Sequence, residues 1–223
     1  MRTFTPVADT AARTAQFFQD GGIFMWALLL VSVVSLTVII LKAVTIRRTL
    51  IIPEQLEKDV DAFEARLDTG EIEGITKTFR EGRSALSRLG AVALSNAGRT
   101  QGEVQEAVQS SAREEVVKLN SGMSVLEVVI AIAPLLGLLG TASGLVVVFQ
   151  DLGQAAQDPA TIARGIARAL NTTIAGLAIS VPSVIAYSYF NRQIETMAVR
   201  LEVLLGKMVS ACHQHVFFKN RKG

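Results

Sequence analysis

Three stretches of the chain contain no Asp, Glu, Lys, Arg or His, and they constrain its fold more than any other feature. They run from Gly22 to Leu41, from Val128 to Phe149 and from Ala169 to Phe190, and each has at least 20 residues. A helix of about 20 residues crosses the roughly 30 Å hydrocarbon core of a bilayer and satisfies its own backbone hydrogen bonds there. The sequence therefore predicts an all-α integral membrane protein with three transmembrane helices.

The rest of the composition argues against several other classes of protein. Half of the 223 residues are hydrophobic, 19% are charged, and the net charge is +2, which does not favour nucleic-acid binding. The single cysteine, Cys212, excludes an internal disulfide. Cys212, His213 and His215 are close in sequence, but too few further ligands exist to complete a tetrahedral metal site. With no nucleotide-binding loop and no Ser/His/Asp grouping, we expect no metal, no cofactor and no enzymatic activity.

The positions of Lys and Arg predict the orientation, because cytoplasmic flanks of membrane spans are enriched in both. Basic residues such as Lys42, Arg47 and Arg192 follow the first and third spans. We therefore place the N-terminus on the outer, periplasmic side and the C-terminus in the cytoplasm. The predicted segments are a periplasmic tail (1–20), a first span (21–43), a cytoplasmic helical segment (44–123), a second span (124–150), a periplasmic loop (151–164), a third span (165–190) and a cytoplasmic C-terminal helix (191–223).

The cytoplasmic segment has the apolar spacing of several helices. A first helix is predicted to begin near Pro53 and end at Gly70, with apolar positions at Leu56, Val60, Phe63 and Leu67. A second short helix carries Leu86, Leu89 and Val92 and ends near Asn96–Gly98.

A third helix is predicted to begin with a capping box, formed by Thr100 and Glu103. An apolar stripe continues from Val104 to Met123 without a proline. We therefore predict one unbroken helix that begins in the cytoplasm and enters the membrane as the second span.

The C-terminal helix carries a coiled-coil-like apolar seam with alternating spacings of three and four residues. Its members are Ile194, Met197, Leu201, Leu204, Met208, Ala211 and His215. The seam either packs on the chain's own cytoplasmic helices or also packs between copies in an oligomer, and both interpretations stay open.

The second and third spans each carry a stripe of small and hydroxyl-bearing residues on one face. In the second span the stripe holds Gly137, Thr141, Gly144 and Val148, with Ala133 beside them. In the third span it holds Gly165, Ala169, Thr172, Thr173, Gly176, Ser180, Ser183 and Tyr187. Small residues commonly serve close helix packing in membranes. The stripe in the third span is longer than one crossing contact needs, which favours a surface that becomes hydrated or slides past a partner.

The spans lack an acidic or basic side chain that could carry a proton across the membrane. Glu127 lies near the cytoplasmic mouth of the second span, and Arg168 lies at the outer end of the third. Proton paths in membranes usually contain ionisable side chains. If this chain conducts protons, another polypeptide must therefore supply the carboxylate. One chain also leaves little to cover both stripes, so we predict a ring of identical subunits.

Long motifs in all three spans resemble the ExbB/TolQ/MotA proton-channel family, with ExbB/TolQ-type biopolymer transport proteins the nearest. The motifs are Gly22-Ile-Phe-Met-Trp-Ala-Leu-Leu-Leu, Ala133-Pro-Leu-Leu-Gly-Leu-Leu-Gly-Thr141, Gly165-Ile-Ala-Arg-Ala-Leu-Asn-Thr-Thr-Ile-Ala-Gly-Leu-Ala-Ile-Ser-Val-Pro182 and Tyr187-Ser-Tyr-Phe-Asn-Arg-Gln-Ile. The number, order and spacing of the spans agree as well, so the resemblance covers nearly the whole chain.

The resemblance implies a motor subunit of the bacterial inner membrane. Family members form pentameric rings around two helices of a single-span ExbD/TolR-type partner, whose membrane aspartate carries the proton. Proton flow then drives work on the envelope, with a TonB/TolA-like transducer among the expected partners. In this sequence the implied pore-lining residues are Thr141 and Thr173, to which the stripes add Thr172, Gly137, Gly144, Gly176 and Ser180. Arg168 and Glu127 are expected to lie at the two mouths of the channel. Pro134 and Pro182 match prolines that shape the spans in the family.

Two positions depart from the family pattern. Arg168 stands where ExbB and TolQ proteins typically carry Glu, and Asn171 replaces an apolar residue. We predict that Arg168 pairs with an acidic group, such as Asp151, Asp158 or one on the partner. Two alternative functions stay open: a MotA-like flagellar or gliding stator subunit, although the flagellar branch has four spans, and a non-conducting scaffold that anchors a partner.

Overall fold

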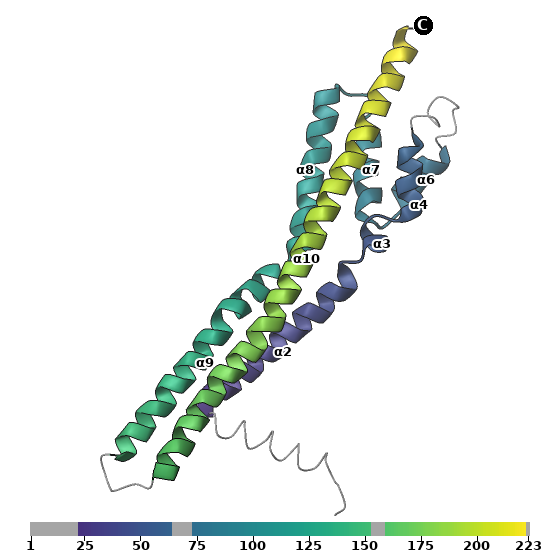
Figure 1. The fold of residues 1–223 in the computed structure, drawn as a ribbon. Helices are drawn as coiled ribbons and strands as arrows, with labels where there is room; N and C mark the ends of the chain where they lie inside the picture. The colour runs from purple at the N-terminus through teal and green to yellow at the C-terminus, as the bar shows by residue number, and fades with distance from the viewer. Residues whose placement is uncertain (1–21, 64–72, 153–158, 222–223) are drawn as a thin grey trace, which may run out of the picture. The chain divides into compact units, whose positions relative to one another are not determined.

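The computed structural model describes residues 22–63, 73–152 and 159–221, and the regular structure within them is helical throughout (Figure 1). In chain order the helices are α2 (Gly22–Thr45), α3 (Arg48–Ile51), α4 (Glu54–Asp61), α6 (Glu73–Glu81), α7 (Ala85–Ser95), α8 (Gln101–Asn120), α9 (Met123–Leu152) and α10 (Pro159–Arg221). By length and composition, α2, α9 and α10 each hold a stretch apolar enough to cross a membrane. The predicted all-α fold with three candidate spans is confirmed.

The chain divides into two compact units. The span unit comprises Met1–Ile40 and Gly122–Ser188, and the charged unit comprises Leu41–Ser121 and Tyr189–Gly223. Helices α2 and α10 contribute residues to both units, while α9 lies in the span unit and α3 to α8 lie in the charged unit.

The short helices of the charged unit follow the sequence pattern closely. Pro53 is the N-cap of α4, one position before its first helical residue, and Leu56, Val60 and Phe63 are buried as their spacing predicts. Leu67 and Gly70 lie outside the described residues. The structure adds α6, which we did not predict and which buries Ile75 and Phe79.

Local side-chain bonds set the starts of α7 and α8. Ser84 caps α7 by accepting a hydrogen bond from the backbone N–H of Ser87 (3.0 Å), and α7 ends at the cap residue Asn96 as predicted. The capping box before α8 is confirmed. The backbone N–H of Thr100 donates to Glu103 Oε2 (3.0 Å), and the N–H of Glu103 donates to Thr100 Oγ1 (3.4 Å).

The prediction of one unbroken helix into the second span is wrong. Helix α8 ends at Asn120, α9 begins at Met123, and Gly122 between them has φ +78°, a left-handed conformation that glycine adopts without a Cβ clash. The last turn of α8 is closed by Lys42, whose Nζ donates to the carbonyl oxygen of Leu119 (2.7 Å). A cation at a helix C-terminus satisfies a free carbonyl and opposes the helix dipole, so the chain stabilises this break from outside α8.

Helix α10 is a single helix of 63 residues, and it contains both the predicted third span and most of the predicted C-terminal helix. It begins at Pro159, where the missing N–H of proline costs nothing. Residues 159–164, which we assigned to the periplasmic loop, are therefore already helical. Pro182 lies inside α10 and Pro134 inside α9, and neither proline ends its helix.

The apolar seam of α10 packs within the chain itself. Its buried members are Ile194, Met197, Leu201, Leu204, Met208 and Ala211. Two ion pairs add to this contact: Arg200 Nε lies 2.6 Å from Glu57 Oε1, and Lys207 Nζ lies 2.6 Å from Asp61 Oδ1. Packing on the chain's own helices is thereby confirmed for these positions. A contact between copies stays a prediction, and the His215 side chain lies outside the described residues.

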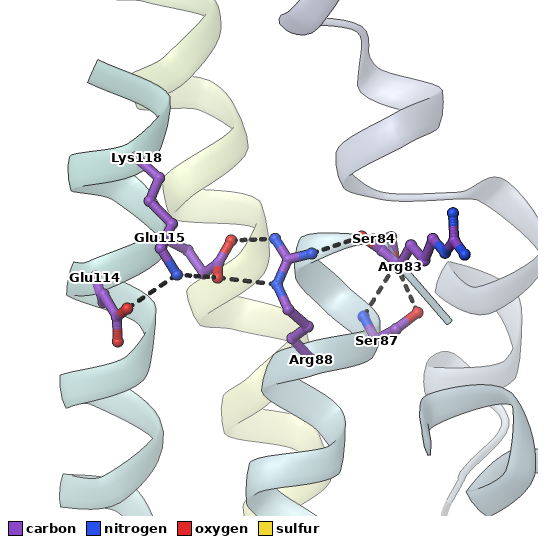
Figure 2. Close-up of polar contacts among 7 residues, drawn as sticks. All are labelled: Arg83, Ser84, Ser87, Arg88, Glu114, Glu115 and Lys118. Atoms are coloured by element: carbon purple, nitrogen blue, oxygen red, sulfur yellow. Dashed lines mark hydrogen bonds and ion pairs between the residues drawn. The ribbon is translucent and has the colours of Figure 1, made fainter. Parts of the chain in front are cut away.

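A polar network joins α7 to α8 (Figure 2). The guanidinium of Arg88 on α7 donates to both carboxylate oxygens of Glu115 on α8, at 2.9 Å from Nε to Oε1 and through Nη2 to Oε2. Lys118 adds a contact of 3.3 Å to Glu115 and one of 2.9 Å to Glu114. The Glu115 side chain is only 8% exposed, and the hydrogen bonds from Arg88 hold the pKa of its carboxyl below the ordinary value.

Candidate functional site

In the span unit, the two small-residue stripes face each other along α9 and α10. A Cβ placed on Gly137 would lie 2.8 Å from Thr172 O and 2.9 Å from Thr173 Cα, and one on Gly176 would lie 2.5 Å from Ala133 O. Such distances to backbone atoms are closer than real Cβ contacts, so both positions need glycine for the backbones to approach this closely.

The close contact continues towards the start of α10. A Cβ on Gly144 would lie 2.8 Å from the Cβ of Ala169, and one on Gly165 would lie 2.5 Å from Val148 Cγ2. The long stripe that we had interpreted as favouring a hydrated surface is thus a helix-packing face over at least three turns. We expected one chain to leave little to cover the stripes. The contact between α9 and α10 buries Gly137, Thr172 and Gly176, while Thr141 and Thr173 stay half-buried.

Three threonine hydroxyls converge on one backbone carbonyl at the centre of this contact. Gly137 O lies 3.0 Å from Thr173 Oγ1, 3.1 Å from Thr172 Oγ1 and 3.2 Å from Thr141 Oγ1. Ala169 O is a second acceptor, at 2.8 Å from Thr172 Oγ1 and 3.0 Å from Thr141 Oγ1. The hydroxyls of Thr141 and Thr173 are also hydrogen-bonded to each other. The hydroxyls therefore have alternative acceptors within reach, and can change partners without leaving the site.

Ser180 has a specific partner that follows from the proline in α9. Pro134 has no N–H, so the carbonyl four residues earlier, at Ile130, loses its usual helical donor. The Ser180 hydroxyl donates to Ile130 O at 3.2 Å. A hydroxyl from a neighbouring helix is one way in which membrane helices satisfy a carbonyl freed by proline. Ser180 thus supplies, from α10, the hydrogen-bond donor that Pro134 cannot provide within α9.

The stripe of α10 also contacts α2. The Ser183 hydroxyl lies 2.7 Å from the Ser35 hydroxyl, and it lies 2.8 Å from the carbonyl of Ile179 on its own helix. Both serines are buried. Ser35 was not singled out in the sequence, because a lone serine in an apolar run has no pattern that identifies its partner.

The predicted site residues differ in how much of their surface stays accessible. Gly137, Thr172, Gly176 and Ser180 are buried in the contact between α9 and α10, while Thr141, Thr173, Gly144 and Pro134 are half-buried and Glu127, Arg168 and Pro182 are exposed. Their roles in a pore or at its mouths stay predictions. We expected Arg168 to pair with an acidic group such as Asp151 or Asp158. Asp158 and the Asp151 side chain lie outside the described residues, so this pairing stays a prediction.

The described part of the chain holds no cluster of three or more His, Cys, Asp or Glu side chains that could bind a metal. Cys212, in the part of α10 beyond the predicted span, is buried. Burial raises the pKa of its thiol to about 11. The thiol is therefore protonated near neutral pH and is a poor metal ligand.

Comparison with known proteins identifies the family. The model of the MotA/TolQ/ExbB proton channel family matches residues 72–203, more than half of the chain. The chain belongs to this family. The match includes α9 and the part of α10 that carries the threonine cluster. Members of the family are channel and transport proteins, not enzymes.

Three relatives show how broadly the similarity extends. A putative biopolymer transport protein ExbB homolog of Methanothermobacter thermautotrophicus is 26% identical over 89% of this chain and 70% of its own length. A putative biopolymer transport protein ExbB-like 1 of Synechocystis is 32% identical over 76% of this chain and 67% of its own. The Tol-Pal system protein TolQ of Pseudomonas aeruginosa is 29% identical over 72% and 76%. Membership implies partners of the ExbD/TolR and TonB/TolA types in general terms.

Proposed function

We propose that this protein is the proton-channel subunit of a motor in the cytoplasmic membrane that couples the proton motive force to mechanical work on an envelope partner. Similarity to proteins named for biopolymer transport supports such a role. We further propose a homopentameric ring, with the N-terminus outside and the C-terminus in the cytoplasm.

The observation that carries the proposal is the threonine cluster inside spans that have no acidic or basic side chain. The hydroxyls of Thr141 and Thr173 are hydrogen-bonded to each other across α9 and α10. Both residues are half-buried, so part of each residue stays open to a partner. A bare charge at mid-bilayer costs at least about 2.5–3.5 kcal/mol on insertion scales. An acidic side chain of a partner can ionise there only if hydroxyls and water solvate it, and these two residues can supply that solvation.

The division of roles follows from what the spans contain. The stretches Val128 to Phe149 and Ala169 to Phe190 have hydroxyls but no carboxylate. The proton carrier therefore belongs to an ExbD/TolR-type single-span partner, and this chain forms the surface along which it is protonated and deprotonated. Rearrangement of the hydroxyl bonds around Gly137 O would accompany that cycle.

Proton flux in liposomes tests the proposal. The purified chain alone, under a proton gradient, should give no specific flux, and co-reconstitution with the single-span partner should confer it. Thr141→Val and Thr173→Val should each reduce the flux about tenfold, the effect of losing one hydrogen bond of roughly 1.4 kcal/mol at the rate-limiting barrier, while the complex still assembles. Thr37→Val is the matched control, because the exposed Thr37 hydroxyl on α2 donates to its own helix, at Val33 O (2.7 Å).

The alternatives give different results. Saturable proton flux through this chain without a partner would overturn the assignment of roles. A complex that assembles but conducts no ions under any gradient would support a non-conducting scaffold. Flux that follows a sodium gradient and ignores the pH gradient would make the transported ion sodium.

A further inference from the structure

A groove of about 660 Å³ runs between α8 and the part of α10 that belongs to the charged unit, where the two helices lie side by side (Figure 1). Its lining extends from Gln101 to Val117 on α8 and from Ala198 to Ser210 on α10, and all of these residues belong to the charged unit. The described lining shares no residue with the threonine site, and the proposed channel function does not use the groove.

Apolar side chains line the groove and stay exposed on both of its walls. Leu205 and Val209 line it and are buried. Val117 on the α8 wall is 69% exposed, and Val199 on the α10 wall is 61% exposed. Val203, one turn from Val199 on α10, is exposed as well. Exposed apolar surface that is rimmed by polar residues marks an interaction site, so the groove needs an occupant.

The length and surroundings of the groove favour a protein helix as the occupant. The lining follows α8 from Gln101 to Val117, which is about 24 Å of helix at a rise of 1.5 Å per residue. Glu106 and Glu114 are exposed on the same helix, so α8 lies in water and acyl chains do not cover this face. A long groove with an apolar lining accepts the apolar face of a further helix.

The charges in the groove indicate which helix fits. One charged residue from each wall lines it, Arg113 from α8 and Glu202 from α10, and neither forms an ion pair within the described part of the chain. The α8 wall of one copy is therefore complementary in charge to α10 of another copy. Arg113 precedes Val128, the start of the second uncharged stretch, by 15 residues, and Glu202 follows Phe190, the end of the third, by 12. Copies that share one membrane therefore hold these two charges at similar sequence distances from their spans.

We propose that this groove binds a second copy of this chain, whose α10 lies along α8 with its Glu202 paired to Arg113. The exposed Val199 and Val203 of the second copy are then buried against Val117. This inference rests on the proposed ring of identical subunits and names the surface by which the charged units associate. The contact joins α8 of one copy to α10 of the next, and such a heterologous contact, repeated by rotation, closes a ring.

Disulfide crosslinking between differently tagged full-length copies in membranes tests this contact. One copy carries Arg113→Cys and the other Glu202→Cys, both in a Cys212→Ala background, so a bridge between the tags cannot form within one chain. Oxidation should yield a dimer with both tags, at least about tenfold more abundant than for the control pair, because a disulfide forms only between cysteines whose Cα atoms lie close together. The control pair is Glu114→Cys with Glu202→Cys. Glu114 is next to Arg113 but points about 100° away from it on α8 and is not among the residues that line the groove.

Charge reversal tests the ion pair by a second route. Arg113→Glu places two carboxylates together and should weaken the association of copies about tenfold, measured by dilution and native mass spectrometry. Arg113→Glu/Glu202→Arg should restore the association, because opposite charges face each other again. Restoration also excludes a folding defect as the cause of the first result.

The remaining outcomes separate this inference from the proposed function. Equal crosslinking of the test and control pairs, or no restoration by the double reversal, would overturn the groove as the contact between copies. If the protein still forms an oligomer and conducts protons with its partner, the channel proposal stands without it. A chain that is monomeric in the membrane would overturn both the ring and the groove contact. Crosslinking of Arg113→Cys to a single-span partner, and not to Glu202→Cys, would place that partner in the groove and overturn the inference as well.

Discussion

The two units of this protein hold their helices together by opposite means. In the charged unit the contacts are made by large apolar side chains, such as Leu86, Leu89 and Leu204, which are almost completely buried, and by ion pairs at the margins. In the span unit the contact between α9 and α10 is made by glycines and hydroxyls, while large apolar side chains such as Leu135 and Leu138 point outward and are exposed in the single chain.

The difference follows from the solvent that each unit meets. In water, burying apolar surface contributes roughly 25 cal/mol per Å², so a leucine is most stabilising inside. In lipid, moving a leucine from the acyl chains into a helix contact gives no hydrophobic stabilisation, because the acyl chains are equally apolar. Membrane helices instead associate where small residues allow close backbone contact and where hydroxyl groups reach hydrogen-bond acceptors. Helix α10 shows both rules on one element, with Gly176 and Ser180 in its first part and Leu204 and Met208 in its second.

The largest expected effect on stability comes from truncating a buried leucine in the apolar core of the charged unit. Leu204 is 0% exposed, and Leu204→Ala should destabilise the protein by about 2–5 kcal/mol. Leu138 is 60% exposed in the span unit, and Leu138→Ala should change stability by no more than about 0.5 kcal/mol. Thermal unfolding in detergent measures both. An equally large loss for Leu138→Ala would show that a second protein surface, not lipid, covers this face.

The next effect compares two glycines on the same helix. Gly176→Ala would force its new methyl group against Ala133 O, and we expect a loss of about 1–3 kcal/mol from the separation of α9 and α10. Gly206 has nothing within 4 Å of an added Cβ, so Gly206→Ala should stabilise the protein by about 0.4–1 kcal/mol. The comparison fails if both substitutions shift the unfolding midpoint in the same direction.

A smaller effect concerns the ion pair between α7 and α8. The hydrogen bonds from Arg88 lower the pKa of Glu115 in the folded state, so this contact stabilises the protein above the unfolded pKa of about 4.3 and is lost as pH falls through the folded pKa. Glu115→Gln should cost about 1 kcal/mol at pH 7, a value kept low because Arg88 is half-exposed. The difference between the two proteins should shrink below about pH 4. A difference that is independent of pH would mean that packing, not charge, joins these helices.

Asp61 is the control for this pH dependence. Hydrogen bonding from Lys207 also lowers the pKa of Asp61, but its side chain is 41% exposed. Asp61→Asn should therefore change the unfolding midpoint less than Glu115→Gln at the same pH.

The smallest effect tests a single hydroxyl in the span unit. Ser180→Ala leaves Ile130 O, which Pro134 already deprives of its helical donor, without its hydroxyl donor from α10. Hydrogen bonds between membrane helices average about 0.6 kcal/mol, so the shift should be small but measurable. In a background where Pro134 is replaced by Ala, the carbonyl regains its own helical donor, and Ser180→Ala should then have less effect. Equal effects in both backgrounds would contradict the assigned partner.

Much of the fold was predictable because it depends on local spacing. The uncharged stretches predicted α2, α9 and α10, and the spacing of Thr100 and Glu103 predicted the start of α8. The break at Gly122 was missed because we followed the continuous apolar stripe and did not weigh Asn120-Ser121-Gly122 as a helix end. Helix α6 was missed because its few apolar positions were too short a pattern to identify.

The sequence by itself determined that this chain spans a membrane, that its spans carry small-residue stripes and that no carboxylate lies within them, because hydropathy, helical period and residue identity are local properties. Only the tertiary structure decided what each stripe touches. Whether Thr172 faces water or the Gly137 carbonyl, and which hydroxyl satisfies Ile130, depends on how α9 and α10 are rotated against each other. This rotation brings together residues that lie 35 and 50 positions apart in the sequence. Rotation is set by the sum of many close backbone contacts, and no short segment of the sequence contains them all.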